Sequence, residues 1–307
     1  MRRTARSPSP SWAWRHVPNV IRRTHAARDG FPDGHEVELP GRGRTFVREV
    51  AGPAGAPTVM LLHGWTATAD LNWFTCFAPL GEHFRVLAPD HRGHGRGIRP
   101  RGSFRLHDCA DDVAAIADAF GVSTFIPVGY SMGGAIAQLV ASRHEQRTRG
   151  LVLAATAGYF SSSRDERLNF LGLTGLARLS KLTSAQARSW ITEQVYLQRK
   201  TQTLADWAAR QIASHDWRHV LEAGSEIGSF DSRPWLHHIA VPAAMIITTD
   251  DKVVPTRRQE ELAATLHTAT VTHRIDAGHD AVFAARERFV PLLIDACQRV
   301  VQHSSVA

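Results

Sequence analysis

A serine with a glycine two positions away on each side is the first feature of this chain that could do chemistry. Gly129-Tyr130-Ser131-Met132-Gly133 follows a strand-like run over 123–128 and precedes a small-residue helical pattern over 135–141. A strand, a sharp turn and a helix in that order predict a strained turn that exposes the serine at the strand's end. The two glycines would let the strand and the helix approach closely. We therefore interpret Ser131 as a nucleophile at a helix N-terminus, where developing negative charge is favoured.

A serine hydroxyl needs a base to take its proton, and the base needs an acid to orient it. His279 follows a predicted strand over 270–275, and histidine can accept and return a proton near neutral pH. Two carboxylates, Asp250 and Asp251, directly follow another apolar run over 243–249. The residue types needed for nucleophilic catalysis therefore each occur just after a predicted strand.

The predicted elements that would carry these residues alternate between strands and helices. Continuous apolar runs are typical of strands buried on both faces of a parallel sheet, and apolar residues at helical spacing predict the helices between them. This alternation indicates the α/β class, with a mostly parallel, doubly wound sheet. The expected strands are 35–39 and 43–50 (joined by a turn at Pro40-Gly41), 58–62, 84–89, 151–156, 243–249 and 270–275; the expected helices are 69–80, 107–120, 256–267 and 281–301.

These landmarks, taken in order, resemble those of the α/β-hydrolase superfamily, over roughly residues 35–302. They are His63-Gly64 after an early strand, the Gly-Tyr-Ser-Met-Gly turn, an aspartate after a later strand, and Gly278-His279 before the last helix. The resemblance implies the family's order of serine, acid and base. It indicates Asp251, four residues before Pro255, as the acid in preference to Asp250. The absence of a carboxylate directly after 151–156 favours this later position for the acid.

The resemblance also implies an oxyanion hole made of two backbone N–H groups. One belongs to Met132, directly after the nucleophile, and the other to Trp65, directly after His63-Gly64. We expect His63 to fix its loop rather than carry protons. The loop over 90–95 is rich in histidine, but its spacing matches no metal-binding pattern, so we expect no metal and no cofactor.

Three parts are expected along the chain: a basic N-terminal extension over 1–34, a core over 35–156 and 240–307, and a helical cap over 157–239. The cap segment is helical and aromatic in pattern and interrupts the alternation of strands. An apolar stretch over 168–176 could form the roof of a hydrophobic pocket, although we expect most of these residues to be ordinary helix-packing core.

The formal net charge of +7 is concentrated in the N-terminal segment. Residues 1–28 hold seven arginines and no acidic residue, which leaves 36 − 7 = 29 basic residues against 29 acidic ones. A neutral body argues against a nucleic-acid partner. Arginines together with Trp12 and Trp14 leave two interpretations of the extension, a flexible segment or a weak membrane-surface contact.

Cysteine content and hydropathy favour a cytoplasmic protein. The chain has three cysteines without a Cys-x-x-Cys pair, and no apolar run of about 18 residues that could span a membrane. No 7–15-residue apolar segment follows the N-terminal arginines, so we expect no signal peptide. Peripheral membrane association is the alternative, and the sequence favours no oligomeric state.

The resemblance implies a serine esterase or lipase-like enzyme that cleaves a small-to-medium hydrophobic carboxylic ester through an acyl-enzyme. A serine at this turn argues against the dehalogenase and epoxide-hydrolase branches, which use aspartate. The same residues also serve C–C bond hydrolases, lactonases, thioesterases, perhydrolases and slow-turnover ligand-binding proteins. C–C hydrolases carry a glycine-richer loop than the one over 65–70, so we favour an ester over a C–C bond.

Overall fold

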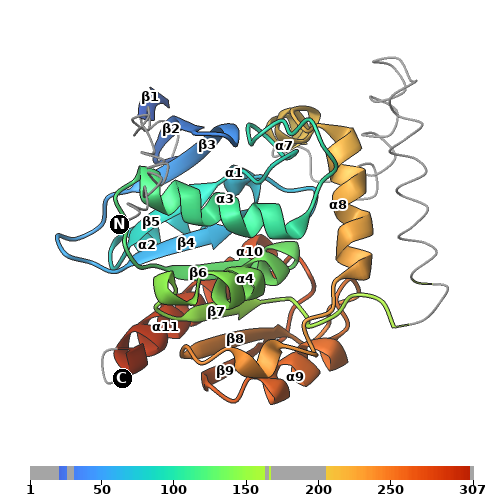
Figure 1. Cartoon of the computed structure of the whole chain (residues 1–307). Coiled ribbons are helices and arrows are strands. Elements are labelled where there is room, and N and C mark those ends of the chain that lie inside the picture. The colour runs from blue at the N-terminus through green and yellow to red at the C-terminus, as the bar shows by residue number, and fades with distance from the viewer. Residues whose placement is uncertain (1–20, 26–30, 163–165, 167–204, 305–307) are drawn as a thin grey trace, which may run out of the picture.

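A twisted sheet forms the centre of the molecule in the computed structural model, which describes residues 21–25, 31–162, 166 and 205–304. Within that part of the chain the sheet has nine strands, in the order β1-β2-β3-β5-β4-β6-β7-β8-β9 (Figure 1). The strands are β1 (Ile21–His25), β2 (Asp33–Leu39), β3 (Gly43–Val50), β4 (Thr58–Leu62), β5 (Arg85–Pro89), β6 (Ile126–Tyr130), β7 (Leu151–Ala154), β8 (Ala243–Thr248) and β9 (Ala269–Ile275).

The sheet has an antiparallel end and a parallel body. β2 and β3 form the expected hairpin, and β3 runs antiparallel to β5. From β5 to β9 every pairing is parallel. The expected α/β class with a mostly parallel sheet is therefore confirmed. The N-terminal extension expected over 1–34 contributes a strand, because β1 pairs with β2 at the edge of the sheet.

Helices cover both faces of the parallel body. They are needed because successive side chains of a strand point to opposite faces, and both faces of these strands are apolar. In β4, Met60 and Leu62 face one apolar cluster, while Val59 and Leu61 face the other. The first cluster includes residues from α3 (Leu106–Ala119), α4 (Met132–Arg143) and α9 (Thr256–Thr265). The second includes residues from α1 (Ala69–Trp73), α2 (Phe77–Gly81), α10 (Ala281–Ala284) and α11 (Arg286–Ser304).

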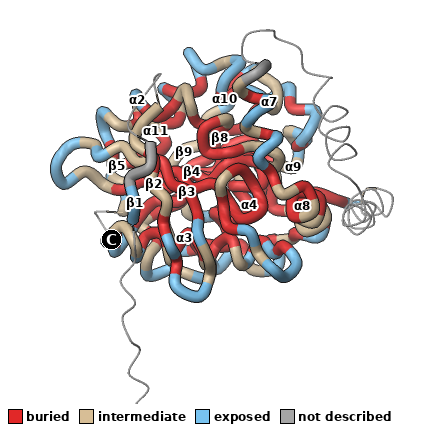
Figure 2. The backbone as a smooth tube through the Cα atoms, turned by 90° about the horizontal axis from the view of Figure 1, so that it is seen from above, coloured by how far each residue is buried: buried red, intermediate tan, exposed pale blue. Residues whose placement is uncertain are grey.

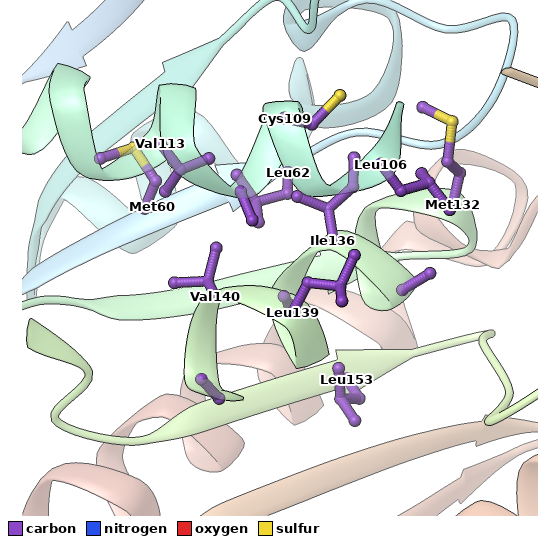
Figure 3. Packing of buried hydrophobic residues seen from close by; sticks show 14 of the residues in the cluster. Met60, Leu62, Leu106, Cys109, Val113, Met132, Ile136, Leu139, Val140 and Leu153 are labelled. Carbon is purple, nitrogen blue, oxygen red and sulfur yellow. The ribbon is translucent and has the colours of Figure 1, made fainter. Parts of the chain in front are cut away.

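The packing of α3 and α4 over β4 fixes the position of the turn that carries the serine. Met132, Ile136 and Leu139 of α4 belong to one buried cluster with Leu106 and Val113 of α3 (Figure 3). Seen from above, β4, β8 and α4 lie among the buried residues, and the exposed residues lie mostly on the outer loops and helix faces (Figure 2). The serine turn therefore lies between two buried elements, β6 and α4.

Two expected helices are interrupted. The helix expected over 69–80 is divided into α1 and α2, with residues 74–76 between them. Pro79 accounts for the break, since a continuous helix would need its missing N–H to donate to the Thr75 carbonyl, where its ring would clash. The helix expected over 281–301 is divided at Ala285 into α10 and α11.

The segment expected as a cap includes three described elements, α7 (Ala205–Ala213), α8 (Trp217–Ser229) and the short 3₁₀ helix η2 (Leu236–His238). α8 stands beside the edge of the sheet at which the parallel strands end (Figure 1). The apolar stretch over 168–176 and the tryptophans at 12 and 14 lie outside the described residues. None of the helices that the structure describes combines the length and the apolar character that crossing a membrane requires.

Candidate active site

Ser131 lies at a strained turn between β6 and α4. Its φ of 55° and ψ of −118° are uncommon for a residue with a side chain. The close approach of the two elements explains the flanking glycines: a Cβ on Gly129 would collide with the backbone of Gly133, and one on Gly133 with the Leu62 carbonyl. The turn is fixed by hydrogen bonds from the Ser131 N–H to the Ala154 carbonyl (3.0 Å) and from the Thr156 hydroxyl to the Ser131 carbonyl (2.7 Å).

His279 follows β9 and lies within hydrogen-bond distance of the serine. Its Nε2 is 3.0 Å from the Ser131 Oγ, and its Nδ1 is 2.7 Å from the Asp251 Oδ2. The Tyr130 hydroxyl donates to the His279 carbonyl at 2.8 Å and so holds this loop from the residue next to the serine. The structure therefore brings Ser131, His279 and Asp251 into one hydrogen-bonded chain.

Asp251 accepts hydrogen bonds from several groups besides its partner His279. Its Oδ1 accepts from the N–H groups of Val253 and Val254, both at 2.8 Å. Its Oδ2, which faces His279, also accepts from the Thr248 hydroxyl at 2.8 Å.

The neighbouring Asp250 points away, since its side chain is 64% exposed and pairs with Lys252. The geometry thus favours Asp251 over Asp250 as the partner of the histidine.

Hydrogen bonding keeps the Asp251 carboxylate ionised. Burial alone would raise the pKa of Asp251, but the hydrogen bond and charge of His279, with the donors Val254 and Thr248, hold that pKa below its ordinary value. An ionised acceptor at Oδ2 requires a proton on Nδ1 of His279. The Nε2 is then left free to accept the serine's proton, which is the tautomer that general-base chemistry needs.

The two expected oxyanion donors belong to backbone next to the serine. Met132 opens α4, and Trp65 lies in the loop after β4, where a Cβ on Gly64 would be 3.4 Å from the Ser131 Cβ. The Asn72 side chain anchors that loop by accepting from the Gly64 N–H at 2.9 Å. Among the described residues, neither the Met132 nor the Trp65 N–H has a hydrogen-bond acceptor. Both groups can therefore donate to an incoming anion.

His63 is fully buried and bonded at both ring nitrogens by the main chain. Its Nδ1 lies 2.8 Å from the Gly64 carbonyl, and its Nε2 accepts from the His91 N–H at 2.9 Å. Burial lowers the pKa of His63, so the ring is neutral. These contacts agree with a residue that fixes its loop.

The loop over 90–95 is tied to the fold by charge-assisted hydrogen bonds. Asp90 accepts from the N–H groups of Ala69 and Arg96 (both 2.8 Å) and from the Arg96 side chain at 3.1 Å. Arg92 binds Asp112 through two nitrogens at 2.7 Å each. Nowhere in the described part of the chain do three or more His, Cys, Asp or Glu side chains form a group that could hold a metal ion.

Sequence reasoning missed a buried polar pair beneath the acid. Thr248 and Gln259 are fully buried, and the Gln259 amide donates to the Thr248 hydroxyl at 2.9 Å and lies 3.3 Å from the Asp251 Oδ2. Gln259 lies in the polar helix α9, whose sequence is typical of a solvent-exposed helix. The one sign of this pair in the sequence was Thr248, a polar residue at the end of an apolar strand and three residues before the acid.

Comparison with known proteins gives a consistent result. The model of the alpha/beta hydrolase fold family matches residues 57–285. The chain is 23% identical, over 264 residues, to the AB hydrolase superfamily protein YisY of Bacillus subtilis, covering 85% of this chain and 97% of that protein. It is 28% identical over 251 residues to a protein of Serratia proteamaculans named as a candidate carbamate hydrolase, RutD, covering 78% and 90% of the two chains.

Solved structures agree with this result at the level of fold. A thermophilic esterase from Thermogutta terrifontis superimposes with a TM-score of 0.70 and 21% identity, covering 92% of this chain and 98% of that one. A hydrolase from Pseudomonas aeruginosa gives a TM-score of 0.70 at 20% identity, with 92% and 99% covered.

Proposed function

The chain belongs to the alpha/beta hydrolase family and is a hydrolase of that fold, and from this premise we propose that it is a serine esterase. Its substrate is a small-to-medium hydrophobic carboxylic ester. The observation that carries the proposal is the chain of hydrogen bonds from the Ser131 Oγ to the His279 Nε2 (3.0 Å) and from the His279 Nδ1 to the Asp251 Oδ2 (2.7 Å).

In the proposed first half-reaction, the Ser131 Oγ attacks the ester carbonyl while the His279 Nε2 takes the hydroxyl proton. Asp251 holds the imidazole and stabilises the positive charge that forms on it. The carbonyl oxygen becomes an oxyanion, which accepts hydrogen bonds from the Met132 and Trp65 N–H groups. Collapse of the intermediate breaks the bond to the alcohol, which leaves with the proton from His279.

In the second half-reaction, water replaces the alcohol. His279 takes a proton from water, whose oxygen attacks the acyl carbon and forms a second oxyanion in the same place. Collapse of this intermediate releases the carboxylic acid and returns the proton to Ser131. Each step uses only groups of this chain, the ester and water, so the proposal requires no cofactor.

Apolar side chains beside the proposed oxyanion loop support a hydrophobic substrate. Ile212, Trp217 and Val220 form a buried cluster against which Trp65 and Leu71 pack. Ile212, Trp217 and Val220 come from the segment 157–239, which we propose forms a cap over the site. A cap of this kind would determine which acyl and alcohol groups reach Ser131, while the catalytic residues determine only how the bond is broken.

A carbamate is the second candidate substrate, because several relatives, including the one from Serratia proteamaculans, are named as candidate carbamate hydrolases. The same residues would attack a carbamate carbonyl and form a carbamoyl-enzyme. Lactones and thioesters have the same electrophilic carbonyl and belong in the same test.

Hydrolysis of a substrate panel tests the proposal. The panel holds p-nitrophenyl esters of two to twelve carbons, a lactone, a thioester and a carbamate, each assayed with the unaltered protein and with Ser131→Ala. We expect multiple turnovers on an ester of short or medium chain, and loss of at least 1,000-fold in Ser131→Ala with the melting temperature retained. Binding without turnover would instead identify a ligand-binding protein of this fold, and faster carbamate cleavage would select the second candidate.

A further inference from the structure

The loop that carries Trp65 has a backbone conformation that its sequence does not favour. Thr66 has a φ of 59°, a region that a β-branched residue rarely adopts. A turn from the Ala67 N–H to the Gly64 carbonyl (3.3 Å) spans this residue. Strained backbone persists only where surrounding contacts hold it, and it often occurs at functional sites. The contacts that hold Thr66 therefore also control the direction of the Trp65 N–H.

Contacts to Thr66 and its neighbours come from residues between 211 and 220, at the end of α7, in the connection after it and at the start of α8, more than 140 positions away in sequence. The Trp65 indole donates to the Val220 carbonyl at 2.7 Å. The Thr68 hydroxyl donates to the Gln211 side chain at 3.0 Å. The His215 Nε2 lies 3.2 Å from the Thr66 carbonyl. One residue of α7, one of the connection after it and one of α8 thus bond to Thr68, Thr66 and Trp65 of the loop between β4 and α1.

His215 is the central member of this set, and its protonation state follows from its partners. Its Nδ1 accepts from the Gly95 N–H at 2.8 Å, so the ring proton must be on Nε2, which then donates to the Thr66 carbonyl. Burial, opposed in part by that hydrogen bond, lowers the pKa of His215 to about 4, so the ring is neutral at pH 7. The next residue is fixed too, since the Asp216 N–H donates to the Gly93 carbonyl at 2.8 Å.

We propose that His215, together with the Val220 carbonyl, is a positioning group that holds the Trp65 N–H in place for the oxyanion. The cap segment would then contribute to transition-state stabilisation as well as to substrate selection. This inference rests on the proposed function, because it assigns a role in the chemistry of that same site. His215 acts through Thr66 and Trp65 and does not touch the reacting atoms.

A positioning role predicts a specific kinetic signature. The ester carbonyl oxygen carries little charge in the bound substrate and full charge in the tetrahedral intermediate. A displaced N–H donor therefore weakens the transition state more than the ground state, which lowers kcat and leaves KM nearly unchanged. A role in substrate access alone would instead raise KM.

Two loop contacts and one control can be altered separately. Trp65→Phe removes the indole donor and keeps an aromatic ring. His215→Phe removes both imidazole hydrogen bonds, whereas His215→Gln retains an amide N–H that can reach the Thr66 carbonyl. Glu222→Ala is the matched control, because Glu222 of α8 accepts from the Phe104 N–H at 2.8 Å and so docks the same helix away from the loop.

The measurements are kcat and KM on the best ester and the Ki of a boronic acid, whose tetrahedral adduct places an oxygen in the oxyanion position. We expect Trp65→Phe and His215→Phe to lower kcat about 10–100-fold, below the about 100–1,000-fold effect of losing a donor outright. The Ki should rise by the same factor and KM should change less than about threefold. His215→Gln should recover most of the loss, and Glu222→Ala should stay within about threefold of the unaltered protein.

An unchanged kcat in Trp65→Phe or in a folded His215→Phe, or an equal loss of kcat in Glu222→Ala, would overturn the positioning role while leaving the esterase assignment intact. Thermal unfolding identifies variants that fail to fold, and Trp65→Phe keeps the test open if His215→Phe is one of them. Absence of turnover in the unaltered protein, with no covalent modification of Ser131 by a fluorophosphonate, would instead refute the proposed function and this inference with it.

Discussion

Replacing Asp251 by asparagine is the change whose consequence follows most directly from the contacts around it. The Val253 and Val254 N–H groups can only donate, and both point at Oδ1 at 2.8 Å. The asparagine carbonyl must therefore occupy the Oδ1 position, which places its NH₂ at the Oδ2 position facing His279. An NH₂ group there can only donate, so the Nδ1 of His279 must accept.

The reversed hydrogen bond disables the base. With Nδ1 as acceptor, the ring proton moves to Nε2, 3.0 Å from the Ser131 Oγ, and that nitrogen can no longer take the serine's proton. The wrong tautomer costs about 10,000-fold in kcat in a serine–histidine–aspartate site. At about 1.36 kcal/mol for each factor of ten, this is about 5.4 kcal/mol of transition-state stabilisation.

Steady-state kinetics of Asp251→Asn on the best ester, beside Asp250→Asn, provide the assay. Asp250 is an exposed residue paired with Lys252 on the surface, so its substitution should change kcat by less than about twofold. Both proteins should retain the melting temperature within a few degrees. A loss below about tenfold in Asp251→Asn, or a larger loss in Asp250→Asn, would refute the tautomer argument and the choice of acid.

Three further predictions concern stability and the support of the site. His215 is buried and neutral in the folded protein, where its pKa is lowered to about 4. In the unfolded chain it binds a proton below about pH 6.5. The free energy of unfolding should therefore fall as the pH drops from 6.5 to 4, by about 3 kcal/mol from this residue, and His215→Gln should remove this part of the dependence, as measured by denaturant titration. Gly133→Ala should destabilise the fold by about 1–3 kcal/mol, because its Cβ would collide with the Leu62 carbonyl, whereas Gly102→Ala, at an open position, should change stability by less than about 0.5 kcal/mol; equal melting temperatures would contradict this. Thr248→Val removes a 2.8 Å hydrogen bond to the Asp251 carboxylate and should lower kcat by about 10–100-fold, because a hydrogen bond to a charged group contributes about 1.5–3 kcal/mol, whereas Thr248→Ser should keep the rate.

The sequence predicted the sheet well because its buried strands carry a strong local signal. Runs such as 58–62 and 243–248 are apolar on both faces, as expected for strands of a parallel sheet that helices cover on both sides. The positions of Ser131, Asp251 and His279 were predictable because each follows a predicted strand within four residues, although the strand before His279 is only partly buried. Of the two helix interruptions, only the one between α1 and α2 could have been predicted from the sequence, because Pro79 lies in that segment.

Contacts between distant polar residues left no such signal. Gln259 occupies a helix of polar composition, yet it is fully buried against Thr248. His215 is one of 17 histidines, and nothing around it distinguishes a residue that bonds to the Thr66 carbonyl. Hydropathy describes how much of a side chain is buried on average, but the partner of a buried polar group is set by tertiary structure.

Covalent labelling of the serine tests the central claim most directly. The protein is incubated with an alkyl fluorophosphonate, and its intact mass and peptide map are measured for the unaltered chain, Ser131→Ala and His279→Ala. We expect a single adduct on Ser131, none in Ser131→Ala, and labelling at least 100-fold slower in His279→Ala, because the base is lost. An unlabelled protein, or an adduct on a different residue, would contradict the assignment of Ser131 as the nucleophile.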